Sequence, residues 1–254
     1  MMICDADIMT KSIRLRAKLG EDANSPIDIF AIAQDIERLT IVYYPMGENL
    51  SGICLKGASG NNVIAINSSM TLGRQRFSLA HELYHLYFDN NMTAICAQKI
   101  GVGQETEKEA DLFASYFLMP AAALHTKVEM MKSKNSGHDL SIHDVVRLEQ
   151  YFQVSHKAAV IRLKQDKLLD ADTADAMMQE GVRRLAESMG YSTELYKPLP
   201  AEKQYMTYGN YIDQAEQVLK RGLVSDGKYE ELLLSAFRSD LVYGDNEGGE
   251  EVID

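Results

Sequence analysis

Two histidines and a glutamate within five positions have the clearest chemical potential in this chain. His81, Glu82 and His85 form the pattern His-Glu-x-x-His. On an α-helix, residues four apart lie one above the other on the same face, so both imidazoles can reach one metal ion. Glu82, beside His81, then leans toward the open side of that ion. Two histidine ligands with a glutamate as general base are the arrangement of zinc hydrolases, so the pattern predicts a Zn²⁺ site with Glu82 as the catalytic residue.

The pattern fixes only three positions, and two surface histidines on an amphipathic helix are the alternative interpretation. The neighbouring residues favour the metal site, because they make this helix apolar almost all round: Leu79, Ala80, Leu83, Tyr84, Leu86, Tyr87 and Phe88. That composition is typical of a buried helix. Charged groups buried without partners are costly, and a metal ion would supply the missing partner.

A third ligand is expected from a second helix, which begins near Glu105 and ends before Pro120. Glu107 and Asp111 are four residues apart and share a face. One carboxylate can bind zinc while the other accepts a hydrogen bond from a ligand histidine. Glu109 points roughly 160 to 200° away from that face, so we predict Glu107 as the ligand. The alternative is that the acidic residues only complement the helix dipole.

Together, the segments Phe77–His85 and Glu107–Pro120 resemble the ImmA/IrrE family of metallopeptidases. The second segment contains Glu-x-Glu-Ala-Asp-x-Phe-Ala and ends in Leu-Met-Pro. The resemblance implies a gluzincin-like zinc site of two histidines and one glutamate, with the glutamate between the histidines as catalyst. It supports Glu107 as a ligand and Asp111 as a partner of a ligand histidine, and it leaves Glu109 as an alternative ligand.

Composition sets limits on compartment and partners. The chain has 254 residues, 46% of them apolar, and a net charge of -11. This acidity argues against nucleic acid as a partner, because phosphates are bound by Lys and Arg; it fits a basic protein partner or simply a soluble protein. Three cysteines without paired spacing suggest neither a disulfide framework nor a thiolate zinc site, which favours the cytoplasm. We expect no signal peptide and no membrane span.

A small sheet of about three strands is expected before the His-Glu helix. The strands are 40–44, 51–56 and 62–67, and the last two form a hairpin. A core helix over 26–39 with Ser25 as its N-cap precedes them. We expect 51–56 to be the edge strand that holds a substrate as an added strand. Gly52 marks either a close backbone approach or a bulge.

Cys96 lies in a segment, 90–104, that we expect to be a loop. A free cysteine is most often a small buried hydrophobe, and this is the expectation for Cys96. The alternative is that its sulfur reaches the zinc and blocks the water position.

After residue 120 the chain is expected to be helical. Ser141 and Ser155 are predicted N-caps of two helices whose layout, through residue 169, imitates a DNA-reading helix-turn-helix. The local charge is only mildly basic, so we expect packing or partner binding and no direct DNA binding. Further helices are predicted over 175–188, 208–221 and 228–237.

The predicted fold class is α+β. We expect a zincin-like minimal metalloprotease domain over 1–125, a helical regulatory or partner-binding region over 126–243, and a disordered acidic tail over 244–254. Tyr84 and Tyr116 are among the candidates for stabilising the oxyanion.

The expected activity is zinc-dependent endopeptidase. What the resemblance implies about the substrate is a helix-turn-helix repressor, whose cleavage relieves repression under stress or on induction of a mobile element. Two alternatives remain open: a hydrolase acting on a toxin or antitoxin partner, and a regulatory binding protein that keeps zinc only as a structural feature.

Overall fold

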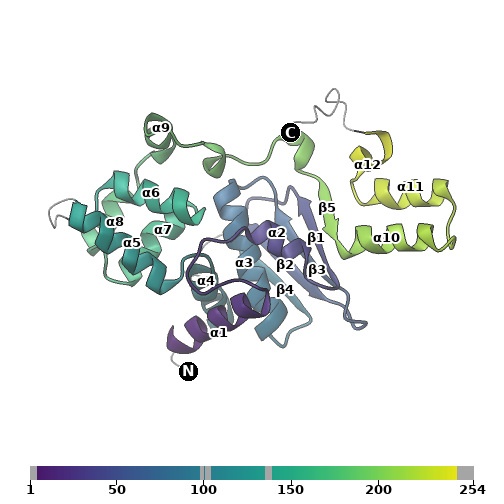
Figure 1. Cartoon of the computed structure of the whole chain (residues 1–254), viewed down its shortest axis with the longest axis horizontal. Coiled ribbons are helices and arrows are strands. Elements are labelled where there is room, and N and C mark those ends of the chain that lie inside the picture. Colours follow the sequence, from purple (N-terminus) through teal and green to yellow (C-terminus); the bar gives the residue numbers. More distant parts are fainter. Residues whose placement is uncertain (1–4, 98–99, 101–103, 135–138, 245–254) are drawn as a thin grey trace.

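The computed structural model describes residues 5–97, 100, 104–134 and 139–244. Over these residues the chain forms twelve α-helices, two short 3₁₀ helices and one five-stranded mixed sheet (Figure 1). The fold class is therefore α+β, as predicted. No helix in the described ranges is long and apolar enough to cross a membrane.

The sheet has the strand order β4-β2-β3-β1-β5. Its strands are β1 (Leu39–Tyr44), β2 (Leu50–Lys56), β3 (Asn62–Asn67), β4 (Thr93–Ala97) and β5 (Met206–Gly209). β1 and β3 are parallel and the other neighbours are antiparallel. The three predicted strands and the β2–β3 hairpin are confirmed.

The prediction that residues 51–56 form the edge strand is wrong. β4 pairs with β2 from Leu55 opposite Thr93 to Leu50 opposite Ala97, and β4 itself takes the edge. The pairing has an irregularity between Leu50 and Gly52. β4 arises in the segment that we expected to be a loop, because a strand of five residues gives little periodic signal.

One face of the sheet is covered by the helices that carry the site. α3 (Leu72–Phe88) packs against β2 and β3, and α4 (Glu105–Leu118) packs against α3. α1 (Asp5–Lys18) lies on α4, so α3 is enclosed between the sheet and this pair (Figure 1). Inward-facing strand residues such as Ile41 and Ile64 form one core with Leu79 and Leu83 of α3.

The helix predicted over 26–39 is shorter than expected. α2 spans only Ile29–Gln34, and its N-cap is Asp28, whose side chain accepts a hydrogen bond from the backbone N–H of Phe30. The expectation of a Ser25 cap is wrong. After α2 the chain turns at Arg38, which has a φ of +60°, and enters β1, so the apolar residues after Gln34 belong to a turn and a strand.

The second half of the described chain is mainly helical. The capping roles of Ser141 and Ser155 are confirmed, and Ser141 forms a capping box with Asp144. The helix predicted over 175–188 is divided into two. The helices are α5 (Ala121–Lys134), α6 (Ile142–Phe152), α7 (His156–Gln165), α8 (Ala171–Met177), α9 (Val182–Ser188), α10 (Asn210–Lys220), α11 (Asp226–Ser235) and α12 (Ser239–Tyr243).

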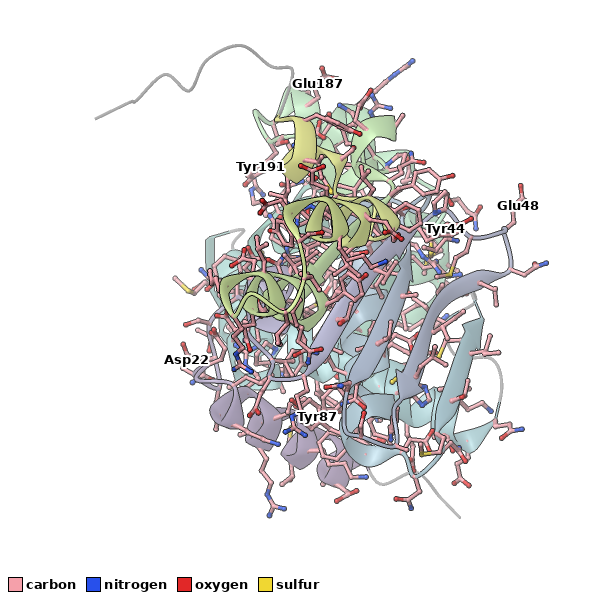
Figure 2. The ribbon with its side chains drawn as sticks, turned by 90° about the vertical axis from the view of Figure 1, so that its right-hand side faces the viewer. Asp22, Tyr44, Glu48, Tyr87, Glu187 and Tyr191 are labelled. Atoms are coloured by element: carbon pink, nitrogen blue, oxygen red, sulfur yellow. The ribbon has the colours of Figure 1, made fainter. Side chains whose placement is uncertain are left out.

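This half also returns to the sheet. β5 follows the 3₁₀ helices Glu194–Tyr196 and Ala201–Lys203 and pairs with β1, and α10 to α12 lie beyond it (Figure 1). The exposed side chain of Tyr44 lies on this side of the molecule (Figure 2), where its ring contacts those of Tyr205 and Phe237. The predicted tail lies outside the described residues, apart from Gly244. The domain boundary at residue 125 stays a prediction.

Candidate metal centre

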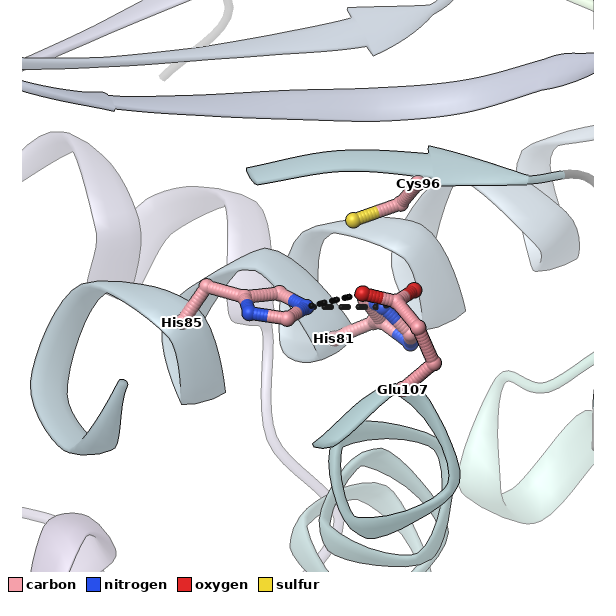
Figure 3. Close-up of side chains that lie close together, drawn as sticks. All are labelled: His81, His85, Cys96 and Glu107. Atoms are coloured by element: carbon pink, nitrogen blue, oxygen red, sulfur yellow. Dashed lines mark hydrogen bonds and ion pairs between the residues drawn. The ribbon is translucent and has the colours of Figure 1, made fainter. Parts of the chain in front are cut away.

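Two neighbouring helices bring three side chains to one point. His81 and His85 come from α3, and their Nε2 atoms are 3.2 Å apart. Glu107, from the first turn of α4, places one carboxylate oxygen 3.3 Å from Nε2 of His81 and the other 3.4 Å from Nε2 of His85. The helix spacing of four residues brings the imidazoles together, and the packing of α4 on α3 supplies the carboxylate (Figure 3).

Two further carboxylates fix the orientation of the imidazoles. Nδ1 of His81 lies 2.8 Å from Asp111, and Nδ1 of His85 lies 2.9 Å from Asp89. A proton on each Nδ1 is donated to these carboxylates, which leaves the two Nε2 lone pairs directed inward. Asp111 was predicted in this position. Asp89 was not, although its spacing of four residues after His85 is the signal that points to it.

The spacing of the inward atoms fits a tetrahedral cation. Ligand atoms about 2.0–2.1 Å from one zinc ion lie about 3.4 Å from each other. The two Nε2 atoms are 3.2 Å apart, and each lies 3.3–3.4 Å from one of the two carboxylate oxygens of Glu107. With both Nδ1 atoms protonated, the three inward groups are all acceptors. A positive charge between them is therefore stabilising.

The carboxylates around His81 also affect its pKa. Burial lowers its pKa, but the hydrogen bonds to Asp111 and Glu107 outweigh burial and raise the pKa to about 10. The pKa of His85 is lowered by burial against the opposing effect of Asp89. The hydrogen bond with His81 lowers the pKa of Glu107. Without a metal ion, a proton on His81 thus partly neutralises the negative charge of the surrounding carboxylates.

Glu82 is fully buried beside this group. Neither of its carboxylate oxygens has a hydrogen-bond partner among the described residues. Burial raises its pKa to about 7, against the opposing charge of His81. Gly52 of β2 packs directly on this side chain, since a Cβ at position 52 would lie 2.5 Å from Oε1 of Glu82. An unpaired carboxylate with a pKa near neutrality is suited to accept and return a proton.

Of the two candidate glutamates on α4, only Glu107 lies with the histidines. Glu109 accepts a hydrogen bond from the hydroxyl of Tyr84. The hydroxyl of Tyr84, one of the candidates for stabilising the oxyanion, therefore already donates its proton to Glu109. The other candidate, Tyr116, stacks with its ring 4.1 Å from the guanidinium of Arg162.

A cysteine completes the group on the side of the sheet. The sulfur of Cys96, in β4, and the ligand atoms of His81, His85 and Glu107 all lie within 4.8 Å of one another (Figure 3). The expectation of a buried cysteine is confirmed, because its exposed fraction is 0%. Burial, followed by the charge of Glu82, raises the pKa of the thiol. The thiol therefore keeps its proton when no metal is near.

Comparison with known proteins places the whole of this group within one family domain. Residues 36–164, from the turn after α2 to the last turn of α7, match the family model Peptidase_M78, the IrrE N-terminal-like domain. The comparison with curated proteins gave no match. The matched segment covers half of the chain and contains α3, β4 and α4. The chain therefore belongs to the Peptidase_M78 family of metallopeptidases.

Proposed function

We propose that the protein is a zinc-dependent endopeptidase whose metal is held by His81, His85 and Glu107. The observation that carries this proposal is the pair of Nε2 atoms, 3.2 Å apart and each 3.3–3.4 Å from an oxygen of Glu107. Beside them lies the buried carboxylate of Glu82, which has no hydrogen-bond partner among the described residues. The family membership of the matched segment supports the same activity.

Each side chain has a distinct part in the reaction. Bound zinc would supply a Lewis acid that polarises the peptide carbonyl and lowers the pKa of a water molecule. Glu82 accepts the proton of the attacking water and passes it to the leaving amine. The two carboxylate oxygens of Glu82 have no hydrogen-bond partner among the described residues, so their lone pairs are available to accept that proton. Asp111 and Asp89 hold the imidazoles in the tautomer that keeps Nε2 free.

The edge of the sheet offers a place for an extended peptide. β4 pairs with β2 on one side and has no partner strand among the described residues on the other. A substrate added as a strand would satisfy the free backbone groups of β4. Cys96 in β4 belongs to the metal group, so such a peptide would lie close to the reacting centre.

We propose a helix-turn-helix repressor as the substrate, so that cleavage in the cytoplasm relieves repression under stress or during induction of a mobile element. The family membership supports this choice, and the net charge of -11 fits a basic partner. In this role the protein itself does not contact DNA. The burial of α7, where Ala158, Val160 and Leu163 belong to the core, supports its packing role.

A second candidate function is a regulatory binding protein that keeps zinc as a structural ion. Four protein donors around one ion are typical of structural zinc sites. The position of Cys96 beside the other three ligand atoms is the observation that favours this candidate.

Glu82→Gln separates the two functions. The experiment uses the native chain, the variant, and a candidate helix-turn-helix repressor, the first choice being one encoded beside the gene if one is found there. We expect the variant to cleave the repressor at least about 100-fold more slowly, because a proton-transfer group is lost. Zinc content and binding to the repressor should stay at native levels. A variant that relieves repression as well as the native protein would contradict the peptidase function.

A further inference from the structure

We propose that Cys96 is a fourth protein ligand of the metal, and that its thiolate closes the site until a substrate arrives. The inference rests on the proposed metal site and adds a resting state to it. Three protein ligands leave a position for water, whereas four protein ligands fill a tetrahedral zinc ion.

The position of the sulfur carries this inference. Cys96 Sγ lies within 4.8 Å of the ligand atoms of His81, His85 and Glu107. Figure 3 shows the sulfur directed from β4 toward the carboxylate of Glu107 and the two imidazoles. Zinc binds a thiolate sulfur at about 2.3 Å, so cysteine is a suitable fourth ligand beside two histidines and a glutamate.

The strand pairing holds Cys96 in place. Cys96 is paired with Gly52 of β2, and the hydroxyl of Ser51 donates a hydrogen bond of 3.3 Å to its carbonyl oxygen. Side chains alternate along β4, so Cys96 is buried while Ile95 is 62% exposed. The pairing of β4 with β2 thus turns the thiol of Cys96 toward the metal group.

A second, independent observation is the unpaired carboxylate of Glu82. It is fully buried beside the metal group and has no hydrogen-bond partner among the described residues. Binding of the thiol to a metal ion would break its S–H bond and form a sulfur–metal bond, and the carboxylate of Glu82 would be the acceptor for the released proton. No oxidant or further reactant is needed for this step.

Opening the site requires that Cys96 leave the metal. β4 is the edge strand and is held by one neighbour, β2. It can therefore shift without breaking the pairing of the other strands. A peptide that adds to the free edge of β4 would act on the strand that carries the blocking thiolate, which links substrate binding to release of the fourth position.

The chain contains a matched control in Cys54. It is also buried and faces the same side of the sheet, in the neighbouring strand β2, but it does not belong to the metal group. Cys54→Ala therefore reports what the loss of a buried thiol does in general. Cys4 lies outside the described residues, and all variants should be made in a Cys4→Ala background.

Cobalt spectroscopy tests the inference directly. With Co²⁺ in place of zinc, we expect a thiolate-to-cobalt charge-transfer band in the near ultraviolet that persists in Cys54→Ala and disappears in Cys96→Ala. The visible d–d bands should remain in both variants and be lost in His85→Ala. We expect Cys96→Ala to bind zinc at least about tenfold more weakly, because even the loss of an outer partner has an effect of that size.

Titration with acetohydroxamate, a small metal chelator, tests whether the thiolate closes the site. It should perturb the cobalt spectrum at lower concentration in Cys96→Ala than in the native chain. A native spectrum with d–d bands but no charge-transfer band would overturn the role of Cys96 and leave the proposed metal site intact. Absence of d–d bands in the native chain would instead overturn the metal site itself. Equal affinity of both proteins for the chelator would overturn the closed resting state.

Discussion

The contact between Gly52 and Glu82 shows how closely single residues are fitted at this site. The backbone of β2 passes so near the buried carboxylate that a Cβ would lie 2.5 Å from Oε1 and 3.0 Å from Cδ. Real Cβ atoms do not approach so closely, so the side chain of Glu82 would have to move. Glycine at position 52 is therefore part of what places the proposed general base.

Gly52→Ala should lower the rate of peptide cleavage by about 100-fold, since a displacement of about 1 Å at a reacting group has an effect of this order. Zinc content should change little, because no ligand is altered. Gly47→Ala is the control, as no atom lies within 4 Å of a Cβ at that position. Equal cleavage rates in the two variants would show that the position of Glu82 does not depend on Gly52.

At the residue scale the helical part of the site could be predicted from the sequence and the strand part could not. Spacing on a helix of known period put His81 and His85 on one face and separated Glu107 from Glu109. The structure groups the first three and directs Glu109 to Tyr84. The approach of Cys96 depends on which residue of β2 it pairs with. No local pattern determines that register.

At the element scale, α1 is joined to α4 by one buried guanidinium. Arg16 donates hydrogen bonds to the carbonyl oxygen of Phe117 at 2.5 Å, to that of Asp22 at 2.7 Å, and to that of Ser25. Its exposed fraction is 1%. This side chain satisfies carbonyl groups from α4 and from the segment after α1, so it joins α1 to the C-terminal end of the helix that carries Glu107.

Arg16→Met should lower the free energy of unfolding by about 3 kcal/mol, because methionine fills similar space but leaves three carbonyl groups without a donor. Urea denaturation followed by circular dichroism measures this change. Arg14→Met is the matched control on the same helix, where the arginine is exposed, and its effect should stay within about 0.5 kcal/mol. Equal destabilisation by both substitutions would show that the buried hydrogen bonds of Arg16 do not stabilise the fold.

Elements with a long periodic pattern were predicted well, and short elements were not. α4 and the strands β1 to β3 match their predicted ranges within a few residues. β4 and β5 have five and four residues, too few for a periodic signal. The apolar pattern of 26–39 suggested one helix, but it is shared between α2, a turn and β1. Tertiary contacts decide such cases over local preference.

At the scale of the whole molecule, the proposed metal links the two helices at the centre of the fold. α3 lies between the sheet and α4, and the ligand atoms come from both helices. Helices of the second half, including α6 and α7, share the same hydrophobic core. Binding of a metal ion to the folded chain should therefore stabilise the molecule as a unit.

Zinc should raise the unfolding temperature of the metal-free chain. At a free concentration of about 100 times Kd, the added stability is about 2.7 kcal/mol, which corresponds to about 5–10 °C for a chain of this size. Scanning calorimetry with and without zinc measures the shift. His85→Ala should show none, and Mg²⁺, which prefers oxygen ligands, should not replace zinc. An equal shift in His85→Ala would place the binding elsewhere.

The central claim is that His81, His85 and Glu107 hold the metal, and the two glutamates of α4 test it most directly. Zinc affinity is measured by competition with a chelator for the native chain, Glu107→Gln and Glu109→Gln. We predict native affinity for Glu109→Gln and a loss of at least about tenfold for Glu107→Gln. Loss of zinc in Glu109→Gln together with native affinity in Glu107→Gln would contradict the claim.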